Sequence, residues 1–521
     1  MYAVPSENDL ISSKQATDDE FLILYGLLLL PLQVGLMCIE SSRVRDKYTS
    51  DVFLKVFLHL VVSCSMYWLI GWRLSFSDGN FFTGYISSRN STTAEYSYSD
   101  SDSYQSPANT MQSAPLQPSA QSQSQSLYTA LVIATPVTLI SAVLLERCNA
   151  ITFLIYSVLI SGVIHPICIH WTWTAQGWLR NLGYVDFSGA GVVFAFAGAS
   201  CFIVSVMMGP RQGRFNENSE ISPIYSTSLF GTGVMLSVVG LISFNCGALH
   251  RTSTSTSMDG AQDSGDGDGD GASVSVDSLN KIIQNTIVGG AGGCLVALAI
   301  GRMRIQQSLW LLSNTANGCF SAMVAVSAAA FAYSALESFT IGMISAVIFT
   351  ALRYFILLLK IDDPIDACPV YFGGGVWGMV AMKIFSRDGM LHSENPSNDL
   401  WSLLINFAGV TAICLWSAIW TIITTLLVKG VQKFAQKEEP EAPDTSNLYQ
   451  EDSCYIEALP MPMPVPMAYP VANVTNVNDA MKSSDRDEYI SRLKSNTRKI
   501  LNTDFHPYEN LALDMELQIR R

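Results

Sequence analysis

Eleven apolar stretches, each long enough to cross a lipid bilayer, constrain this chain more than any other feature of its sequence. A helix of ~20 residues crosses the hydrocarbon core, and in lipid the backbone polar groups must be satisfied within the helix. We therefore expect an all-α polytopic membrane protein with about eleven transmembrane helices. The stretches cover residues 20–39, 53–75, 127–145, 150–172, 188–208, 224–247, 281–301, 309–331, 336–359, 367–385 and 402–428.

Composition supports this class and argues against several others. Of the 521 residues, 49% are hydrophobic and only 14% are charged, and the mean hydropathy is +0.27 despite long polar tracts. No basic patch or zinc-ligand spacing suggests a nucleic-acid partner. The eleven cysteines form no CxxC pair and fall mostly in apolar runs, so no disulfide framework is expected. We find no motif for an enzyme, a metal or a cofactor.

Two segments, residues 186–194 and 366–378, have the same design in different halves of the chain. Each begins with an aspartate and continues into an apolar, glycine-rich stretch. A carboxylate at the mouth of a membrane helix is costly, and glycines allow helices to approach closely. We therefore predict two repeated halves with a route between them. Asp186 and Asp366 would be the structural acids of the repeats, and Gly374, Gly375 and Trp377 would pack helices together.

Basic residues near the spans predict the orientation. Arg43, Arg211, Arg302 and Lys429 all follow odd-numbered spans, so these ends are expected in the cytoplasm. The N-terminus would then lie outside and the C-terminal tail inside. Asn90 begins an Asn-Ser-Thr glycosylation sequon in a loop that this topology places outside.

The predicted domain organisation follows from these spans and from two low-complexity loops. The loops are rich in Ser, Gln, Gly and Asp and cannot bury a core, so we expect both to be disordered. The expected parts are an extracellular N-terminus at 1–19, a membrane domain at 20–428 that contains the disordered extracellular loops 76–126 and 249–279, and a cytoplasmic tail at 429–521.

Several short motifs occur in an order and spacing that resemble the ammonium transporter family, whose superfamily includes the Rhesus proteins. Each motif alone has little specificity, but together they span residues 20–428. They are the basic stretch 42–47, Glu146-Arg147, Trp171-Thr172-Trp173, Asp186-Phe187, the segment 209–215, Phe244-Asn245-Cys246-Gly247, and Asp362, Asp363 and Asp366 before the segment 374–378.

The resemblance implies a fold, an assembly and a substrate. It implies a trimer of eleven-helix subunits, each with its own central pore between two inverted five-helix repeats. An outer vestibule would recruit ammonium against aromatic rings, and two pore histidines would form a line of hydrogen-bonding nitrogens. Trp173 matches the vestibule tryptophan, and Asp186 is expected to serve recruitment there as well as the helix start. Phe244 matches the inner gate phenylalanine.

This chain departs from the family pattern at the positions that carry the transport chemistry. Counting from the acid of each repeat, Phe194 and Tyr371 stand where the family has its two histidines. Phenylalanine carries no proton, and a tyrosine hydroxyl titrates near pH ~10. In the vestibule Ala248 replaces a serine, and Val132 replaces the outer gate phenylalanine. A proton relay built as in the family is therefore absent.

Each candidate also has a structural interpretation. Asp186 and Asp366 are typical of acids that cap free amides at a helix start. Trp173 is equally typical of an interfacial tryptophan, and Phe244 of a packing residue. Asp362 and Asp363 are expected in a solvated mouth. The histidines of the fourth span, His165 and His170, are expected to be packing residues.

Two hypotheses for function remain. The first is transport of ammonium, ammonia or methylammonium across the plasma membrane by a homotrimer in contact with lipid. The second is a non-conducting family member that acts as an ammonium sensor, or as a modulatory subunit in a heteromer with related transporters. The family scaffold favours the first, and the substituted pore positions favour the second.

Overall fold

The computed structural model describes residues 19–44, 49–77, 79–84, 120–144, 147–148, 150–211, 214–215, 224–258, 276–304, 307–387, 389–393 and 396–437. All of them belong to the first of two compact units, Met1–Ile456, and the second, Glu457–Arg521, lies outside the described residues. The same holds for the predicted glycosylation site Asn90, nearly all of the predicted N-terminal segment and most of the two predicted loops.

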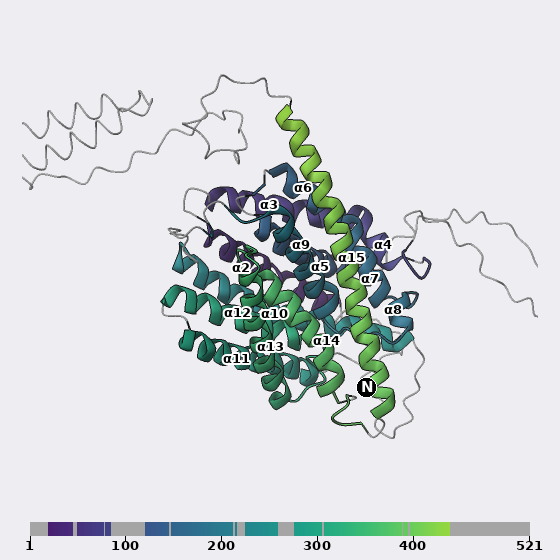
Figure 1. Cartoon of the computed structure of the whole chain (residues 1–521). Helices are drawn as coiled ribbons and strands as arrows, with labels where there is room; N and C mark the ends of the chain where they lie inside the picture. The colour runs from purple at the N-terminus through teal and green to yellow at the C-terminus, as the bar shows by residue number, and fades with distance from the viewer. Residues whose placement is uncertain are drawn as a thin grey trace, which may run out of the picture. The chain divides into compact units, whose positions relative to one another are not determined.

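The described residues form a bundle of helices (Figure 1). Ten helices in these residues are long and apolar enough to cross a membrane. The helical elements are α2 Leu30–Ser41, α3 Thr49–Met66, η2 Tyr67–Gly71, α4 Trp72–Phe76, α5 Ala120–Leu144, α6 Ala150–Leu159, η3 Ile160–Ile164, α7 His165–Trp173, α8 Trp178–Asn181, η4 Ala190–Ala195, α9 Phe196–Met208, α10 Thr227–Met258, α11 Val276–Arg304, α12 Ser308–Val326, α13 Ala335–Leu358, η5 Cys368–Gly373, α14 Gly374–Phe385 and α15 Pro396–Lys437.

Ten of the eleven predicted stretches correspond to these membrane-length helices. The remaining stretch, 367–385, is a π-helical turn, η5, continued by the short helix α14. Helix ends also reach into regions predicted as loop or tail. Helix α5 begins at Ala120, α10 ends at Met258, α11 begins at Val276, and α15 ends at Lys437.

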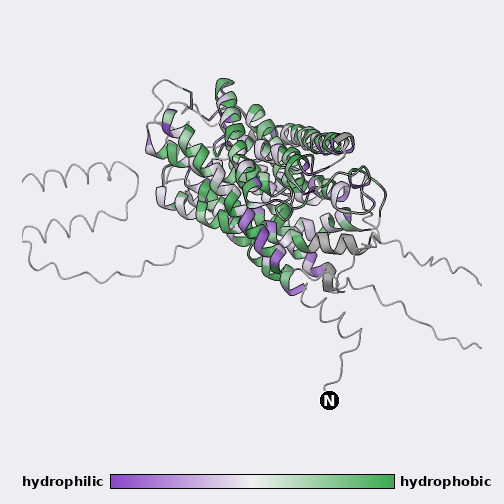
Figure 2. Ribbon diagram, turned by 90° about the horizontal axis from the view of Figure 1, so that it is seen from below, coloured by the Kyte–Doolittle hydropathy of each residue, from purple (hydrophilic) through white to green (hydrophobic). Residues whose placement is uncertain are grey.

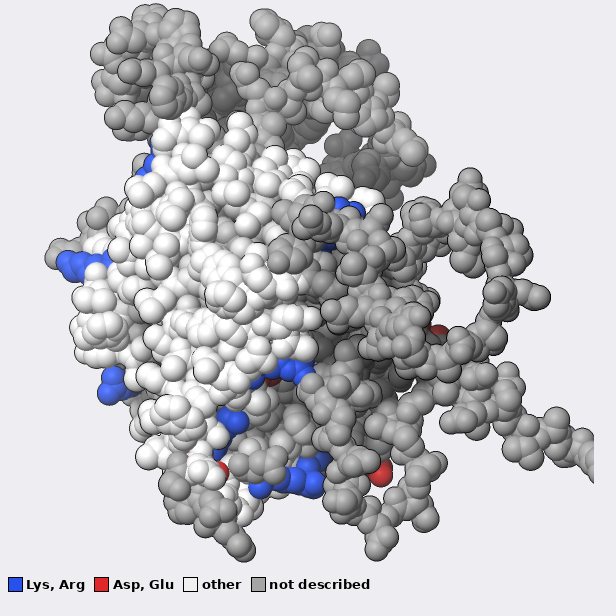
Figure 3. All heavy atoms as spheres, turned by 90° about the vertical axis from the view of Figure 1, so that its right-hand side faces the viewer, with Lys and Arg blue, Asp and Glu red and all other residues white. Residues whose placement is uncertain are grey.

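Apolar side chains cover the outside of the bundle as well as its core. Trp68 is 73% exposed and Met235 is 70% exposed, and many leucine side chains of α15 are also exposed. Most helices are coloured as hydrophobic in Figure 2, and the face in Figure 3 has a broad area without charge, with Lys and Arg near its margins. A continuous apolar exterior of this extent suits contact with lipid. The chain is an integral membrane protein.

The two halves meet where their equivalent elements cross. Helix α2 packs against α10, α9 packs against η5, and η4 packs against α14. The approach is closest at Gly198 of α9, where a Cβ would collide with the backbone nitrogen of Phe372. Glycine is therefore required for this crossing. The π-helical turns η4 and η5 are both six residues long and each starts the span that carries a predicted pore position.

Candidate pore site

Asp186 caps the first π-helical turn with both of its carboxylate oxygens. Oδ1 accepts hydrogen bonds from the amides of Gly189 at 2.8 Å and Ala190 at 3.0 Å. Oδ2 accepts from Gly191 and Val192, both at 2.9 Å. The turn into η4 requires Gly189, whose φ of 110° is left-handed. The buried carboxylate thus satisfies four amides at a helix start, an arrangement that favours the charged form.

In the second half the corresponding cap is made by Asp363, three residues before the acid that the sequence predicted. Asp363 Oδ2 accepts from the amide of Cys368 at 2.8 Å. The spacing of five residues equals that from Asp186 to Gly191 in the first half. Asp366 binds side chains instead: Oδ1 pairs with Arg353 at 3.1 Å and Oδ2 accepts from Asn317 at 2.8 Å. Asp366 is a structural acid, but it is not the repeat partner of Asp186.

The predicted pore positions come together in an aromatic group. Phe194 and Tyr371 each follow their capping acid by eight residues, and their rings stack with centroids 5.9 Å apart and planes 16° apart. Phe244 of α10 packs on Phe194 at 5.0 Å. All three side chains are buried. The group holds one polar side-chain atom, the hydroxyl of Tyr371, so it contains no proton relay that works near neutral pH.

The predicted vestibule residues lie on three different elements. Trp173, at the end of α7, donates its indole N–H to the carbonyl of Asp186 at 3.1 Å and is 9% exposed. Val132 on α5 and Ala248 on α10 are buried and carry no polar side-chain atom. A recruiting role for Trp173 stays a prediction.

The three predicted packing residues lie where α14 meets its neighbours. A Cβ at Gly374 would stand 2.6 Å from the carbonyl oxygen of Ser321, and one at Gly375 would stand 2.8 Å from the amide nitrogen of Ala195. Trp377 donates its indole N–H to a carbonyl of α13 at 3.1 Å. These contacts tie α14, the helix that continues the second π-helical turn, to both halves.

His165 lies beside the first π-helical turn. Its Nε2 is 2.9 Å from the carbonyl oxygen of Val192, and its ring lies 4.8 Å from that of Phe196. The sequence showed a histidine in an apolar span but not that it touches the element carrying Phe194. Its position, 27 residues before Val192, leaves no local signal of this contact.

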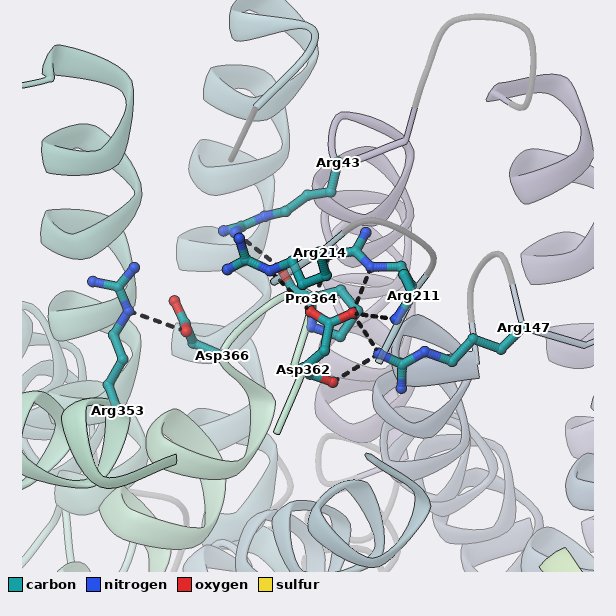
Figure 4. Close-up of polar contacts among 8 residues, drawn as sticks. All are labelled: Arg43, Arg147, Arg211, Arg214, Arg353, Asp362, Pro364 and Asp366. Carbon is teal, nitrogen blue, oxygen red and sulfur yellow. Dashed lines mark hydrogen bonds and ion pairs between the residues drawn. The ribbon is translucent and has the colours of Figure 1, made fainter. Parts of the chain in front are cut away.

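A cluster of arginines surrounds Asp362 at one end of the bundle (Figure 4). Arg147 and Arg211 reach Asp362 Oδ2, each at 2.8 Å, and Arg214 reaches Oδ1 at 3.2 Å. The side chain of Asp362 is 1% exposed, so the expectation of a solvated mouth is wrong for this residue. Three guanidinium groups supply the partners that a buried carboxylate requires. Sequence analysis did not reveal this cluster.

The cluster extends to a fourth arginine, which follows the first span. Arg43 donates through Nη1 to the carbonyl of Pro364 at 3.1 Å and through Nη2 to the hydroxyl of Ser313 at 3.0 Å. Arg43, Arg211 and Arg214 all follow odd-numbered spans, and the structure brings them to the same loop, which agrees with a common side.

The pKa values of the two neighbouring acids of this loop, Asp362 and Asp363, are shifted in opposite directions. Burial alone would raise the pKa of Asp362, but hydrogen bonds and charge from Arg211, together with the charge of Arg147, hold that pKa below its usual range. Burial, reinforced by the nearby charge of Asp366, raises the pKa of Asp363 to about 6. Among the described residues, Asp363 Oδ1 is buried without a hydrogen-bond partner.

Comparison with known proteins identifies the scaffold. The model of the Ammonium Transporter Family matches residues 20–453. The chain belongs to this family. In this chain the family scaffold carries two capped π-helical turns, with Phe194 and Tyr371 on the crossing segments.

Individual relatives and solved structures agree with this assignment. The chain is 28% identical over 389 residues to a putative ammonium transporter of Caenorhabditis elegans, a match that covers 72% of this chain and 64% of that protein. A putative ammonium transporter of Synechocystis is 28% identical, with 72% and 76% covered. The fold resembles a structure titled Sensor Amt Protein, with a TM-score of 0.66, 22% identity, and 81% and 95% covered. Candida albicans Mep2 gives a TM-score of 0.63, 18% identity, and 82% and 86% covered.

Proposed function

We propose that this protein transports ammonium or ammonia across a membrane through a pore between its two halves. The observation that carries the proposal is the crossing of η4 and η5, which places Phe194 and Tyr371 in one stack at equivalent positions of the repeats. Family membership and the names of the relatives support ammonium as the substrate. Methylammonium is a suitable probe because it carries the same ammonium head.

The same proposal includes a homotrimer in the plasma membrane, with the arginine cluster on the cytoplasmic side. Basic residues that follow odd-numbered spans support this orientation. The apolar exterior of the described helices offers surface both to lipid and to neighbouring subunits. Bare ammonium would be costly among Phe194, Phe244 and Tyr371, so the species that passes them is neutral ammonia.

A second function is favoured by the same aromatic group. Phe194 lies between Phe244 and Tyr371 and removes every hydrogen-bonding atom from its own position. A subunit closed in this way would serve as an ammonium sensor or as a modulator of conducting relatives.

Methylammonium uptake in yeast that lack their own ammonium transporters separates the two functions. The wild type is compared with a Phe194→His and Tyr371→His double variant, with surface expression measured for each. A Phe407→His variant is the matched control, because Phe407 is half exposed on α15 and its change adds a histidine outside the pore. The proposal expects uptake by the wild type above that of cells without the protein.

The outcomes are distinct. Uptake by the wild type would mean that a pore without histidines conducts. No uptake by the wild type, with uptake gained only in the double variant, would overturn the transport proposal in favour of a closed scaffold. If neither the wild type nor the double variant supported uptake at normal surface expression, transport would also be excluded. Val132 and Ala248 would then be the next positions at which to introduce the family residues.

A further inference from the structure

A second group of buried polar side chains lies between α2, α3 and α5, on helices other than those that carry the aromatic stack. It consists of Glu40 near the end of α2, His59 on α3 and Ser141 near the end of α5. They are 1%, 0% and 3% exposed. Each stands in a largely apolar span, and ionisable residues buried inside membrane helices are rare and costly. Neither the proposed pore nor the arginine cluster uses them.

Ser141 joins the two ionisable groups. Its Oγ lies 3.2 Å from Glu40 Oε2 and 3.4 Å from His59 Nε2. The same oxygen lies 2.7 Å from the carbonyl oxygen of Thr138, to which it donates. Within the described part of the chain, Glu40 Oε1 and His59 Nδ1 are buried and have no further hydrogen-bond partner.

Counting hydrogens assigns a proton to this group. A hydroxyl has one hydrogen to donate and two lone pairs. The carbonyl of Thr138 only accepts, and at 2.7 Å it requires a hydrogen between the two oxygens. With that single hydrogen given to Thr138, the contacts of Ser141 Oγ with Glu40 and His59 are hydrogen bonds only if both of these side chains donate. Glu40 is then a carboxylic acid, and His59 carries a hydrogen on Nε2.

Within the part of the chain that the structure describes, nothing else compensates a charge on Glu40. Among the described residues no arginine or lysine forms an ion pair with it. Lys55, one turn from His59, turns its Nζ to the carbonyl of Cys148 at 3.4 Å. Cys201 of α9 and Tyr371 of η5 are the titratable groups of other elements whose electrostatic interaction reaches Glu40. An isolated carboxylate here would cost several kcal/mol or more.

We propose that Glu40, Ser141 and His59 form a proton-binding site in the membrane domain, separate from the aromatic stack of Phe194, Tyr371 and Phe244. The ligand is a single proton held by Glu40 and hydrogen-bonded to Ser141. Its release at alkaline pH leaves a carboxylate that keeps no donor from Ser141, so α2, α3 and α5 lose a shared contact. Helix α5 packs on α9, where Cys201 bonds the carbonyl of Leu139, so the site adjoins a helix that crosses the second half.

Infrared spectroscopy of the purified full-length protein tests this proposal without any transport assay. The spectrum is recorded at pH about 8, where Asp363, with its pKa of about 6, is ionised and silent. The wild type is expected to show the carbonyl band of a protonated carboxylic acid, with an isotope shift in heavy water. Glu40→Gln should remove the band. Glu337→Gln, which alters an acid that caps α13, should leave it unchanged.

A second variant covers the case in which Glu40→Gln fails to fold. Ser141→Ala removes the acceptor of the acid hydrogen, so the band should move to higher wavenumber while remaining present. A wild type without the band at pH about 8, or a band unchanged in both variants, would overturn the proposal. The result does not depend on whether the pore conducts, so failure here and failure of the transport proposal are separate outcomes.

Discussion

The two halves of the membrane domain hold the same π-helical turn at its start by different means. In the first half Asp186 accepts four backbone amides, so both of its oxygens are satisfied locally. In the second half Asp363 is bonded by an amide through one oxygen, and the other oxygen is buried without a partner among the described residues. The adjacent Asp362 instead collects three arginines from distant segments.

The difference separates a local solution from one that depends on the whole fold. The first cap uses residues within six positions of Asp186 and needs no charged partner to form. The loop of the second half is held by arginines more than 140 residues away along the chain. We therefore expect substitutions in the second loop to report on global packing, and substitutions at the first cap to report on the turn itself.

The largest effect is expected when Asp362 loses its charge. Asp362→Asn would leave Arg147, Arg211 and Arg214 with no carboxylate at their centre, and removing one partner of a buried pair costs ~3–5 kcal/mol. Thermal unfolding of the purified protein, followed by loss of helical signal, measures the change.

Asp366→Asn is the matched control for that variant. Asp366 lies in the same loop, but it pairs with one arginine, Arg353, and both side chains are partly open at 13% and 12% exposure. Its change should cost less than that of Asp362, because one guanidinium group loses a carboxylate partner instead of three. Equal losses in the two variants would mean that the arginine cluster does not hold the loop.

The next effect compares the two caps directly. In Asp186→Asn one carbonyl oxygen can accept two amides, while the NH₂ group faces the remaining two donors, so ~2–3 kcal/mol of stability should be lost. Asp363→Asn keeps an acceptor for Cys368 and removes a buried charge. It should be neutral or stabilising near neutral pH. Chemical denaturation of both variants at one pH makes the comparison, and matching losses would contradict it.

An effect that depends on pH follows from the titration of Asp363. Its pKa is raised to about 6, so between pH ~4 and ~6 the folded protein holds a proton that the unfolded chain releases. This contribution is therefore greatest below pH ~4 and is lost as the pH rises through 6, by at most ~3 kcal/mol. Asp362 acts in the opposite direction, because its lowered pKa gives stability that is lost only in acid.

The difference between wild type and Asp363→Asn isolates this titration. Both proteins contain Asp362, so its acid loss cancels in the difference. Unfolding midpoints measured across pH 4–8 should converge in acid, separate progressively between pH ~4 and ~6, and keep a constant difference above that range, with the variant the more stable. A difference that does not change with pH would show that Asp363 does not titrate in this range.

The sequence predicted the spans well and the electrostatics poorly. Apolar runs such as 188–208 give their helix directly, because the run length must match the bilayer. The stretch 367–385 was harder, since a π-helical turn and a short helix leave the same hydropathy as one span. The sequence contains the spacing of eight residues from Asp363 to Tyr371, which equals that from Asp186 to Phe194. However, three aspartates lie close together in this loop, and only the structure identifies which of them caps the turn.

Contacts between distant segments could not be predicted, because no local sequence pattern indicates them. Arg147 and Asp362 are 215 positions apart, and each looked like an ordinary charge at the end of a span. Glu40 and His59 likewise stand singly in apolar runs, and only the packing of α2, α3 and α5 brings them to one serine. Sequence reasoning locates such residues but cannot pair them without the fold.

The smallest effect on stability, and the most informative for the pore, is expected from Tyr371→Phe. Among the described residues its hydroxyl has no hydrogen-bond partner, so stability should change by less than ~1 kcal/mol. If the stack conducts, this hydroxyl is its one polar contact for ammonia, and its loss should slow methylammonium uptake about three- to tenfold, or ~0.7–1.4 kcal/mol. Tyr333→Phe is the matched control, because Tyr333 is also buried with an unpartnered hydroxyl. Slower uptake in Tyr371→Phe alone would make the stack the conducting route. Equal uptake in both variants and the wild type would place the route elsewhere, and the resemblance between the two halves would then be one of packing and not of transport.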